Sequence, residues 1–90
     1  MAAETEEFLT PGMIRAARGL LGLGQADVAE LAGLAQRTIS KLEGESDFSM
    51  KDLRRRKALA ALKEAFENQG IEFLFATAMA GEGVRLKVSR

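Results

Sequence analysis

Apolar residues recur three and four positions apart over the first three quarters of the chain, which is the spacing of one face of an α-helix. Near the start, for example, Ile14, Ala17 and Leu21 share such a face. The pattern predicts three short helices and then a longer helix that begins at Ser49 and stops before Asn68. The three short helices are expected over about 11–21, 25–32 and 36–43.

The ends of these helices carry residues whose chemistry suits a terminus. Thr10 supplies an N-cap hydroxyl, and Pro11 stands at the first helical position, where proline is tolerated. Ser49 followed by Asp52 resembles a capping box at the start of the longer helix. Gly33 lies between the second and third helices, where a sharp turn needs the left-handed backbone conformation that glycine adopts at little cost.

After Gly70 the period of the apolar residues changes from 3.6 to 2, which is the period of a β-strand. Two strands are predicted, joined through residues 81–83. Their alternating positions are Ile71, Phe73 and Phe75 in the first strand and Val84, Leu86 and Val88 in the second. The expected fold is therefore mainly α, with a C-terminal β-hairpin or strand pair. The expected divisions are an acidic N-terminal arm over 1–9, a helical domain over 10–70 and a β extension over 71–90.

The second and third helices have the pattern of a helix-turn-helix. Ala29 is small where the two helices approach, and Gly33 allows the turn between them. Apolar side chains point inward from Val28, Ala32, Leu34, Ile39 and Leu42. The outward residues of the third helix are Gln36, Arg37, Ser40 and Lys41, with Thr38 at the flank. Amide, guanidinium, hydroxyl and amine groups on a protruding helix suit the base edges and phosphates of DNA.

The composition narrows the classes of function. The chain has 90 residues, 13 of them basic and 13 acidic, and it contains neither Cys nor His. It therefore lacks thiolate and imidazole metal ligands and cannot build a Ser-His-Asp triad or a cysteine nucleophile. We expect no metal, no cofactor and no enzymatic activity. Because no apolar stretch approaches the roughly 18 residues of a membrane span, and the acidic start is unlike a signal peptide, we expect a cytoplasmic, nucleoid-associated protein without membrane contact.

The region from Ile14 to Gly44 resembles the Xre/phage-repressor family of helix-turn-helix transcription regulators. The matching positions are Gln25, Val28-Ala29, Gly33-Leu34, Thr38-Ile39-Ser40 and Glu43. Ala35 stands where the family often has a serine or threonine cap, and Gly44 comes one position earlier than the usual glycine. The resemblance implies a lambda-repressor-like helical domain that binds double-stranded DNA.

The resemblance also implies roles for single residues. Gln25 would touch a phosphate or buttress the third helix, and Gln36 and Arg37 would read bases. Arg18 of the first helix would form a salt bridge with Glu43 at the end of the third. The residues expected to contact phosphates or flanking bases are Thr38, Ser40 and Lys41.

The charges are unevenly distributed although they sum to zero. The stretch from Lys51 to Lys63 holds six cations against one acid, Asp52. Such a stretch can contact nucleic acid. We interpret it instead as a solvated helix face, because a helix beyond the helix-turn-helix need not reach the duplex.

A single helix-turn-helix contacts only a few base pairs, so we expect a two-fold homodimer whose recognition helices lie about 34 Å apart. An isolated strand pair is marginal in water and leaves edges unpaired, which favours pairing with a second chain through residues 71–90. Arg85 or Lys87 would then meet Glu72 across the joint. The expected interface residues are Ile71, Phe73, Phe75, Val84 and Leu86. The alternative is a monomer whose hairpin caps its own helices.

The predicted function is that of a sequence-specific transcription regulator, a repressor that binds a two-fold operator. The alternative is an antitoxin-like interaction protein, in which residues 71–90 bind a protein partner and the helix-turn-helix regulates its own gene.

Overall fold

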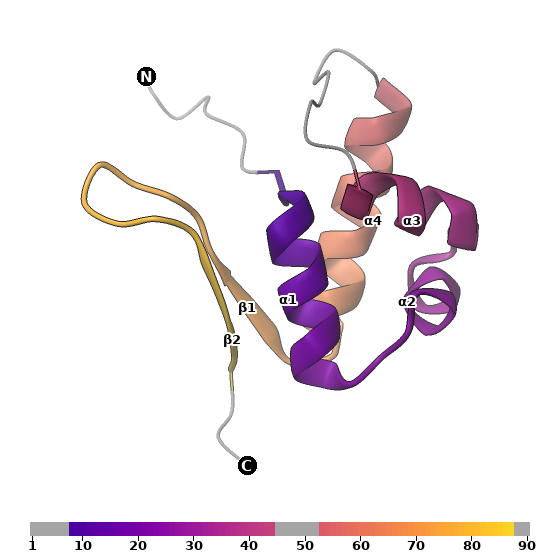
Figure 1. The fold of residues 1–90 in the computed structure, drawn as a ribbon, viewed down its shortest axis with the longest axis horizontal. Helices are drawn as coiled ribbons and strands as arrows, with labels where there is room; N and C mark the ends of the chain where they lie inside the picture. Colours follow the sequence, from indigo (N-terminus) through magenta and orange to yellow (C-terminus); the bar gives the residue numbers. More distant parts are fainter. Residues whose placement is uncertain (1–7, 45–52, 88–90) are drawn as a thin grey trace.

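The computed structural model describes residues 8–44 and 53–87, and within them four helices precede a β-hairpin (Figure 1). The elements are α1 (Pro11–Leu21), α2 (Gln25–Ala32), α3 (Gln36–Gly44), α4 (Leu53–Asn68), β1 (Ile71–Leu74) and β2 (Gly83–Leu86). The expected mainly helical fold with a C-terminal hairpin is confirmed. The helix start expected at Ser49, its capping box with Asp52, and residues 1–7 of the expected acidic arm lie outside the described residues.

The ends of α1 follow the sequence signals. The Thr10 hydroxyl accepts a hydrogen bond from the Met13 backbone N–H at 3.2 Å, and Pro11 occupies the first turn. At the other end Gly22 has φ of 69°, and its N–H and that of Leu23 bond back to carbonyls of the last turn. These bonds satisfy backbone groups that a helix end would otherwise leave without partners.

The turn between α2 and α3 depends on Gly33. Its φ is 71°, in the left-handed region, and the next residue, Leu34, donates its N–H to the Ala29 carbonyl at 2.9 Å. A Cβ added to Gly33 would meet no atom of the described residues within 4 Å, so the backbone conformation and not the available space calls for glycine. The turn sets the direction in which α3 leaves α2.

All four helices and β1 contribute to one core. Its largest fully buried side chains are Leu9, Met13, Ile14, Val28, Ile39, Leu59, Leu62, Phe66 and Ile71. Phe66 of α4 meets Phe73 of β1 edge to face, with ring centroids 6.0 Å apart. None of the helices among the described residues is long and apolar enough to cross a membrane.

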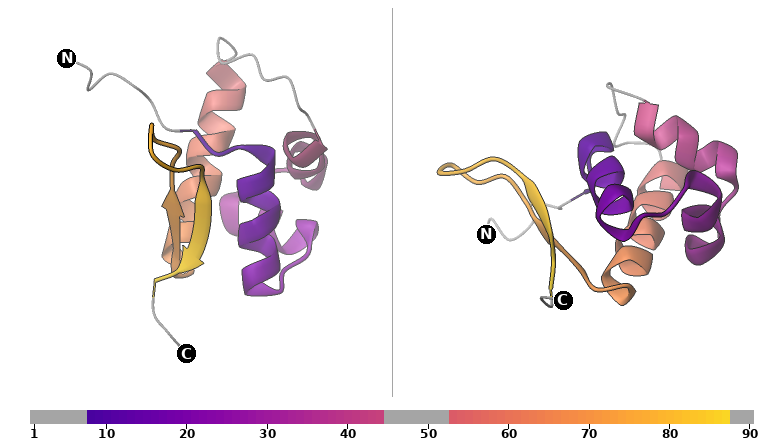
Figure 2. Two further views of the ribbon diagram at one scale, coloured as in Figure 1. Left: turned by 60° about the vertical axis from the view of Figure 1, so that its left-hand side comes forward. Right: turned by 60° about the horizontal axis from the view of Figure 1, so that its bottom comes forward.

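The two strands form an antiparallel pair in which Ile71 lies opposite Leu86 and Phe73 opposite Val84. Each strand has four residues, so β1 ends before Phe75 and β2 ends at Leu86. Val88 of the expected second strand lies outside the described residues. Figure 2 shows the strands beside α1 and α4 and the connecting loop extending beyond the helices. The Thr10 hydroxyl donates to the Glu82 carboxylate at 2.6 Å, which ties the base of this loop to the start of α1.

The hairpin makes contacts within its own chain at positions expected to serve a contact between chains. Ile71 and Phe73 are only 0% and 8% exposed, because their own chain covers them, so neither is available to a second chain in this fold. Arg85 pairs with Glu72 of the same chain, at 2.9 Å between Nε and Oε1. The directly opposite placement of these two residues in the register accounts for this contact.

Candidate nucleic-acid interface

The helix α3 is amphipathic, and its outer face is polar. Ile39, Leu42 and Glu43 are buried against the rest of the domain. The exposed residues on the opposite face are Gln36, Arg37, Ser40 and Lys41, and Thr38 at the flank is half-buried. Five of the residues expected to contact DNA therefore lie together on one helix, with hydrogen-bonding groups that reach solvent.

Arg18 and Glu43 join α1 to the end of α3. Arg18 Nε donates to Glu43 Oε2 at 2.7 Å, and Arg18 Nη2 donates to Glu43 Oε1 at 2.9 Å. The contact is therefore bidentate. The remaining guanidinium nitrogen donates to the Leu23 carbonyl at 3.1 Å. Glu43 is 5% exposed and Arg18 is 25% exposed, so the pair is largely shielded from water. It fixes the recognition helix against α1.

Two further residues complete this cluster. The Gln25 amide donates to Glu43 Oε1 at 3.2 Å, so of the two roles expected for Gln25 its side chain makes the buttressing contact. Arg15 donates to the Glu43 backbone carbonyl at the end of α3. The sequence reasoning did not select Arg15. Its position three residues before Arg18, on the same side of α1, is the signal that could have identified it.

The cluster keeps its carboxylate ionised. Burial by itself raises the pKa of Glu43. Hydrogen bonds from Arg18 and Gln25 and the positive charges of Arg18 and Arg15 lower this pKa by more, so that it lies below its ordinary value. The hydrogen bond to Glu43 likewise raises the pKa of Arg18. A fully charged, hydrogen-bonded pair therefore supports α3 at neutral pH.

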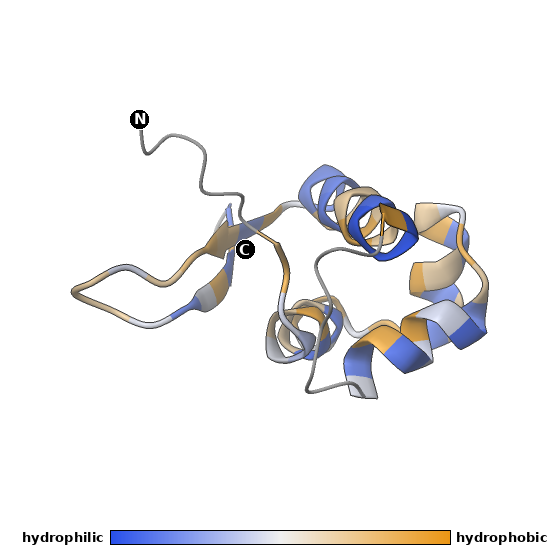
Figure 3. Cartoon of the chain, turned by 90° about the horizontal axis from the view of Figure 1, so that it is seen from above, coloured by the Kyte–Doolittle hydropathy of each residue, from blue (hydrophilic) through white to orange (hydrophobic). Residues whose placement is uncertain are grey.

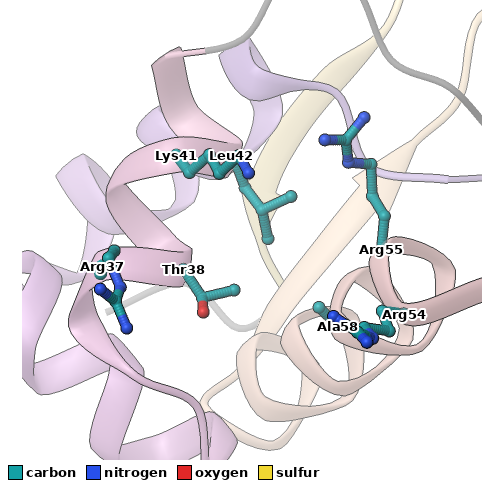
Figure 4. Close-up of a pocket in the computed structure, with 7 residues that line it drawn as sticks. All are labelled: Arg37, Thr38, Lys41, Leu42, Arg54, Arg55 and Ala58. Carbon is teal, nitrogen blue, oxygen red and sulfur yellow. The ribbon is translucent and has the colours of Figure 1, made fainter. Parts of the chain in front are cut away.

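A groove of about 270 Å³ runs between α3 and α4 (Figure 4). One wall is formed by Arg37, Thr38 and Lys41 of α3 and the other by Arg54 and Arg55 of α4. Leu42 and Ala58 complete the lining. The structure therefore brings two cations of the basic stretch in α4 next to two cations of the recognition helix, which the charge pattern did not predict.

A family model described as helix-turn-helix matches residues 14–55. This chain carries a Cro/C1-type helix-turn-helix domain. The resemblance to the Xre/phage-repressor family is confirmed, and that family is one of DNA-binding regulators that are not typically enzymes. No curated protein matches the chain.

The helix-turn-helix domain contains every residue expected to contact DNA, and it also contains the groove residues Arg54 and Arg55. The hairpin lies outside the matched region. Of the residues expected at a dimer interface, Phe75, Val84 and Leu86 are half-buried and keep some exposed surface. Beyond Phe75, the loop is exposed from residue 76 to residue 82, and Met79 within it is 92% exposed.

Proposed function

We propose that this protein is a sequence-specific transcription regulator that represses its target genes by binding a two-fold operator. The observation that carries the proposal is the exposed polar face of α3 within a helix-turn-helix domain of a DNA-binding family. A helix about 10–12 Å wide matches the major groove, which is about 12 Å wide. We expect α3 to enter that groove and the protein to act in the cytoplasm, at the chromosome.

Gln36 and Arg37 are the proposed base-reading residues. They occupy the first turn of α3 and are both exposed, and in helix-turn-helix complexes the N-terminal part of the recognition helix contacts base edges. An amide can bond adenine with two hydrogen bonds, and a guanidinium can do the same with guanine. Lys41 lies one turn further along, where its ammonium suits a phosphate, and the hydroxyls of Thr38 and Ser40 suit phosphates or flanking bases.

The test begins with selection of binding sequences from a random pool of duplexes by the wild-type protein. Arg37→Ala should relax the preference at one base pair per half-site, by about 1–3 kcal/mol. Lys41→Ala should weaken binding to all sequences alike and lower the salt dependence. If wild type enriches no sequence, or if the Gln36→Ala/Arg37→Ala double variant binds the selected site as tightly as wild type, the proposal fails.

A two-fold operator requires two copies of the chain, and we propose that they pair through residues 71–90. Phe75, Val84 and Leu86 keep exposed apolar surface, and the loop that follows Phe75 is uncharged up to Glu82. Figure 3 shows this loop as apolar to neutral, whereas the helices carry hydrophilic and hydrophobic residues in alternation. Sedimentation of the full chain should give a dimer, with or without operator DNA. A chain that is monomeric even on DNA would rule the dimer out.

The same loop also suits an antitoxin-like role, in which it binds a different protein. The specific observation is Met79, which is 92% exposed in an uncharged segment. Met79→Asp places a charge on this surface. In a homodimer the substitution should shift sedimentation toward the monomer. If the loop binds a different protein, the oligomeric state should stay unchanged while complex formation with that protein is lost.

A further inference from the structure

We propose that the groove between α3 and α4 holds the DNA backbone, with Arg54 and Arg55 of α4 binding a phosphate beside the helix that reads the bases. The inference rests on the proposed DNA-binding function and adds a second element to its interface. The groove is lined by Arg37, Lys41, Arg54 and Arg55, and none of its seven described lining residues is acidic.

The position of the groove follows the geometry of a helix in the major groove. A helix 10–12 Å wide nearly fills a groove about 12 Å wide, so the phosphate ridge of one strand must run alongside that helix. The hollow beside α3 has α4 as its second wall (Figure 4). A ridge lying there meets Lys41 from α3 on one side and Arg54 and Arg55 from α4 on the other.

The chemistry of the lining fits a sugar-phosphate chain. Guanidinium groups match phosphate oxygens with two parallel hydrogen bonds, and the Thr38 hydroxyl adds a neutral donor. The apolar surfaces of Leu42 and Ala58 at the same hollow suit deoxyribose.

Arg54 and Arg55 also have a different task from the exposed face of α3. Phosphate contacts position a protein on the duplex without reading its sequence. Two arginines on a separate helix would hold the backbone beside α3 on any duplex, whatever bases Gln36 and Arg37 meet. They should therefore add affinity and salt dependence equally for all sequences.

The experiment compares wild type with Arg54→Gln/Arg55→Gln on the selected operator and on an unrelated duplex. Each lost phosphate contact should reduce the slope of log K against log salt by about 0.9. When NaCl is raised from about 50 to about 200 mM, the affinity of the variant should therefore fall less than that of wild type, by a factor of about 3.5 for each lost contact. The ratio of operator to unrelated binding should stay as in wild type. Arg54→Lys/Arg55→Lys keeps both charges and should keep most of the slope.

The matched control is Lys63→Gln, which removes a positive charge from the same helix at a position outside the groove. It should leave the slope unchanged. Thermal melting without DNA checks that each variant is folded. A slope for Arg54→Gln/Arg55→Gln equal to that of wild type, in a folded variant, would overturn the groove while leaving the DNA-binding function intact. If wild type itself binds no DNA, the proposed function fails as well.

Neutral methylphosphonate linkages, placed one at a time along the operator, locate the contact. At the phosphate in the groove, the substitution should weaken wild type but have little further effect on Arg54→Gln/Arg55→Gln. Equal losses for both proteins at every position would also overturn the proposal.

Discussion

The helix-turn-helix domain and the hairpin hold their charged groups in different ways. In the domain, Glu43 is 5% exposed and accepts hydrogen bonds from Arg18 and Gln25. In the hairpin, Glu72 and Arg85 form one ion pair at a similar distance, but they are 39% and 61% exposed. Both carboxyls have a pKa below the ordinary value. Similar contacts therefore differ mainly in their access to water.

This difference determines what each contact contributes. A buried charge that loses its partner keeps the cost of its removal from water, whereas an exposed charge is rehydrated at once. The Glu43 cluster also fixes the helix proposed to read DNA, whereas the Glu72 pair joins only two neighbouring strands. Stability and the orientation of α3 should therefore depend on the cluster and hardly at all on the strand pair.

The largest expected effect comes from Glu43→Ala. The substitution removes the carboxylate that pairs with the Arg18 guanidinium, which then keeps only its hydrogen bond to the Leu23 carbonyl. It also removes the acceptor of the hydrogen bond from the Gln25 amide. Losing one partner of a buried pair costs about 3–5 kcal/mol, and the partial exposure of Arg18 places this case near 3 kcal/mol. Urea denaturation at neutral pH measures the change. If Glu43→Ala is as stable as wild type, the Glu43 cluster does not contribute more to stability than the exposed Glu72 pair.

A smaller loss is expected from Gly33→Ala in the turn before α3. Because φ is 71°, an alanine there must adopt the left-handed region, at a cost of about 1–2 kcal/mol. Gly19→Ala is the matched control, since Gly19 is exposed, within α1 and without a positive φ. It should stabilise the protein by about 0.5–1 kcal/mol. Thermal melting separates the two signs, and a stabilised Gly33→Ala would contradict the role assigned to the turn.

Local signals were sufficient to predict most of the helical part from the sequence. Thr10, Pro11 and Gly33 act through their own backbone or the next turn, so their effects can be inferred without knowledge of the fold. The helix-turn-helix resemblance added the pairing of Arg18 with Glu43, which are 25 residues apart and which no periodicity would have joined.

The parts that could not be predicted depend on packing between distant elements. The orientation of α4 decides whether Arg54 and Arg55 face solvent or α3, and the charge pattern contains no information on that orientation. The burial of Phe73 likewise requires that β1 pack on Phe66 of α4. Alternation in β1 predicted an apolar face but not the surface that covers it.

The pH dependence of stability should arise in part from Glu43. Its pKa is lowered in the folded protein, so it contributes stability above its unfolded pKa of about 4.3, and this contribution is lost as the pH falls through the folded value. Glu43→Gln should be less stable than wild type at pH 7 and should lose less stability on acidification. Urea titrations from pH 7 to about 3 test this. Parallel curves for the two proteins would show that Glu43 is not a source of the acid sensitivity.

The smallest effect is expected from Glu72→Gln in the hairpin. The hydrogen bond from Arg85 is the main cause that lowers the pKa of Glu72, but both side chains are exposed, and water and ions replace the lost contact. The melting temperature should therefore stay within error of wild type, and any difference should vanish in 1 M salt, where the screening length is about 3 Å. Glu43→Gln, measured in parallel, should keep most of its deficit in the same salt, because the Arg18–Glu43 contact is shielded from solvent. Should Glu72→Gln destabilise the chain as much as Glu43→Gln does, exposure would not be the property that separates the two pairs, and the hairpin would have a larger structural role than its position at the edge of the helices indicates.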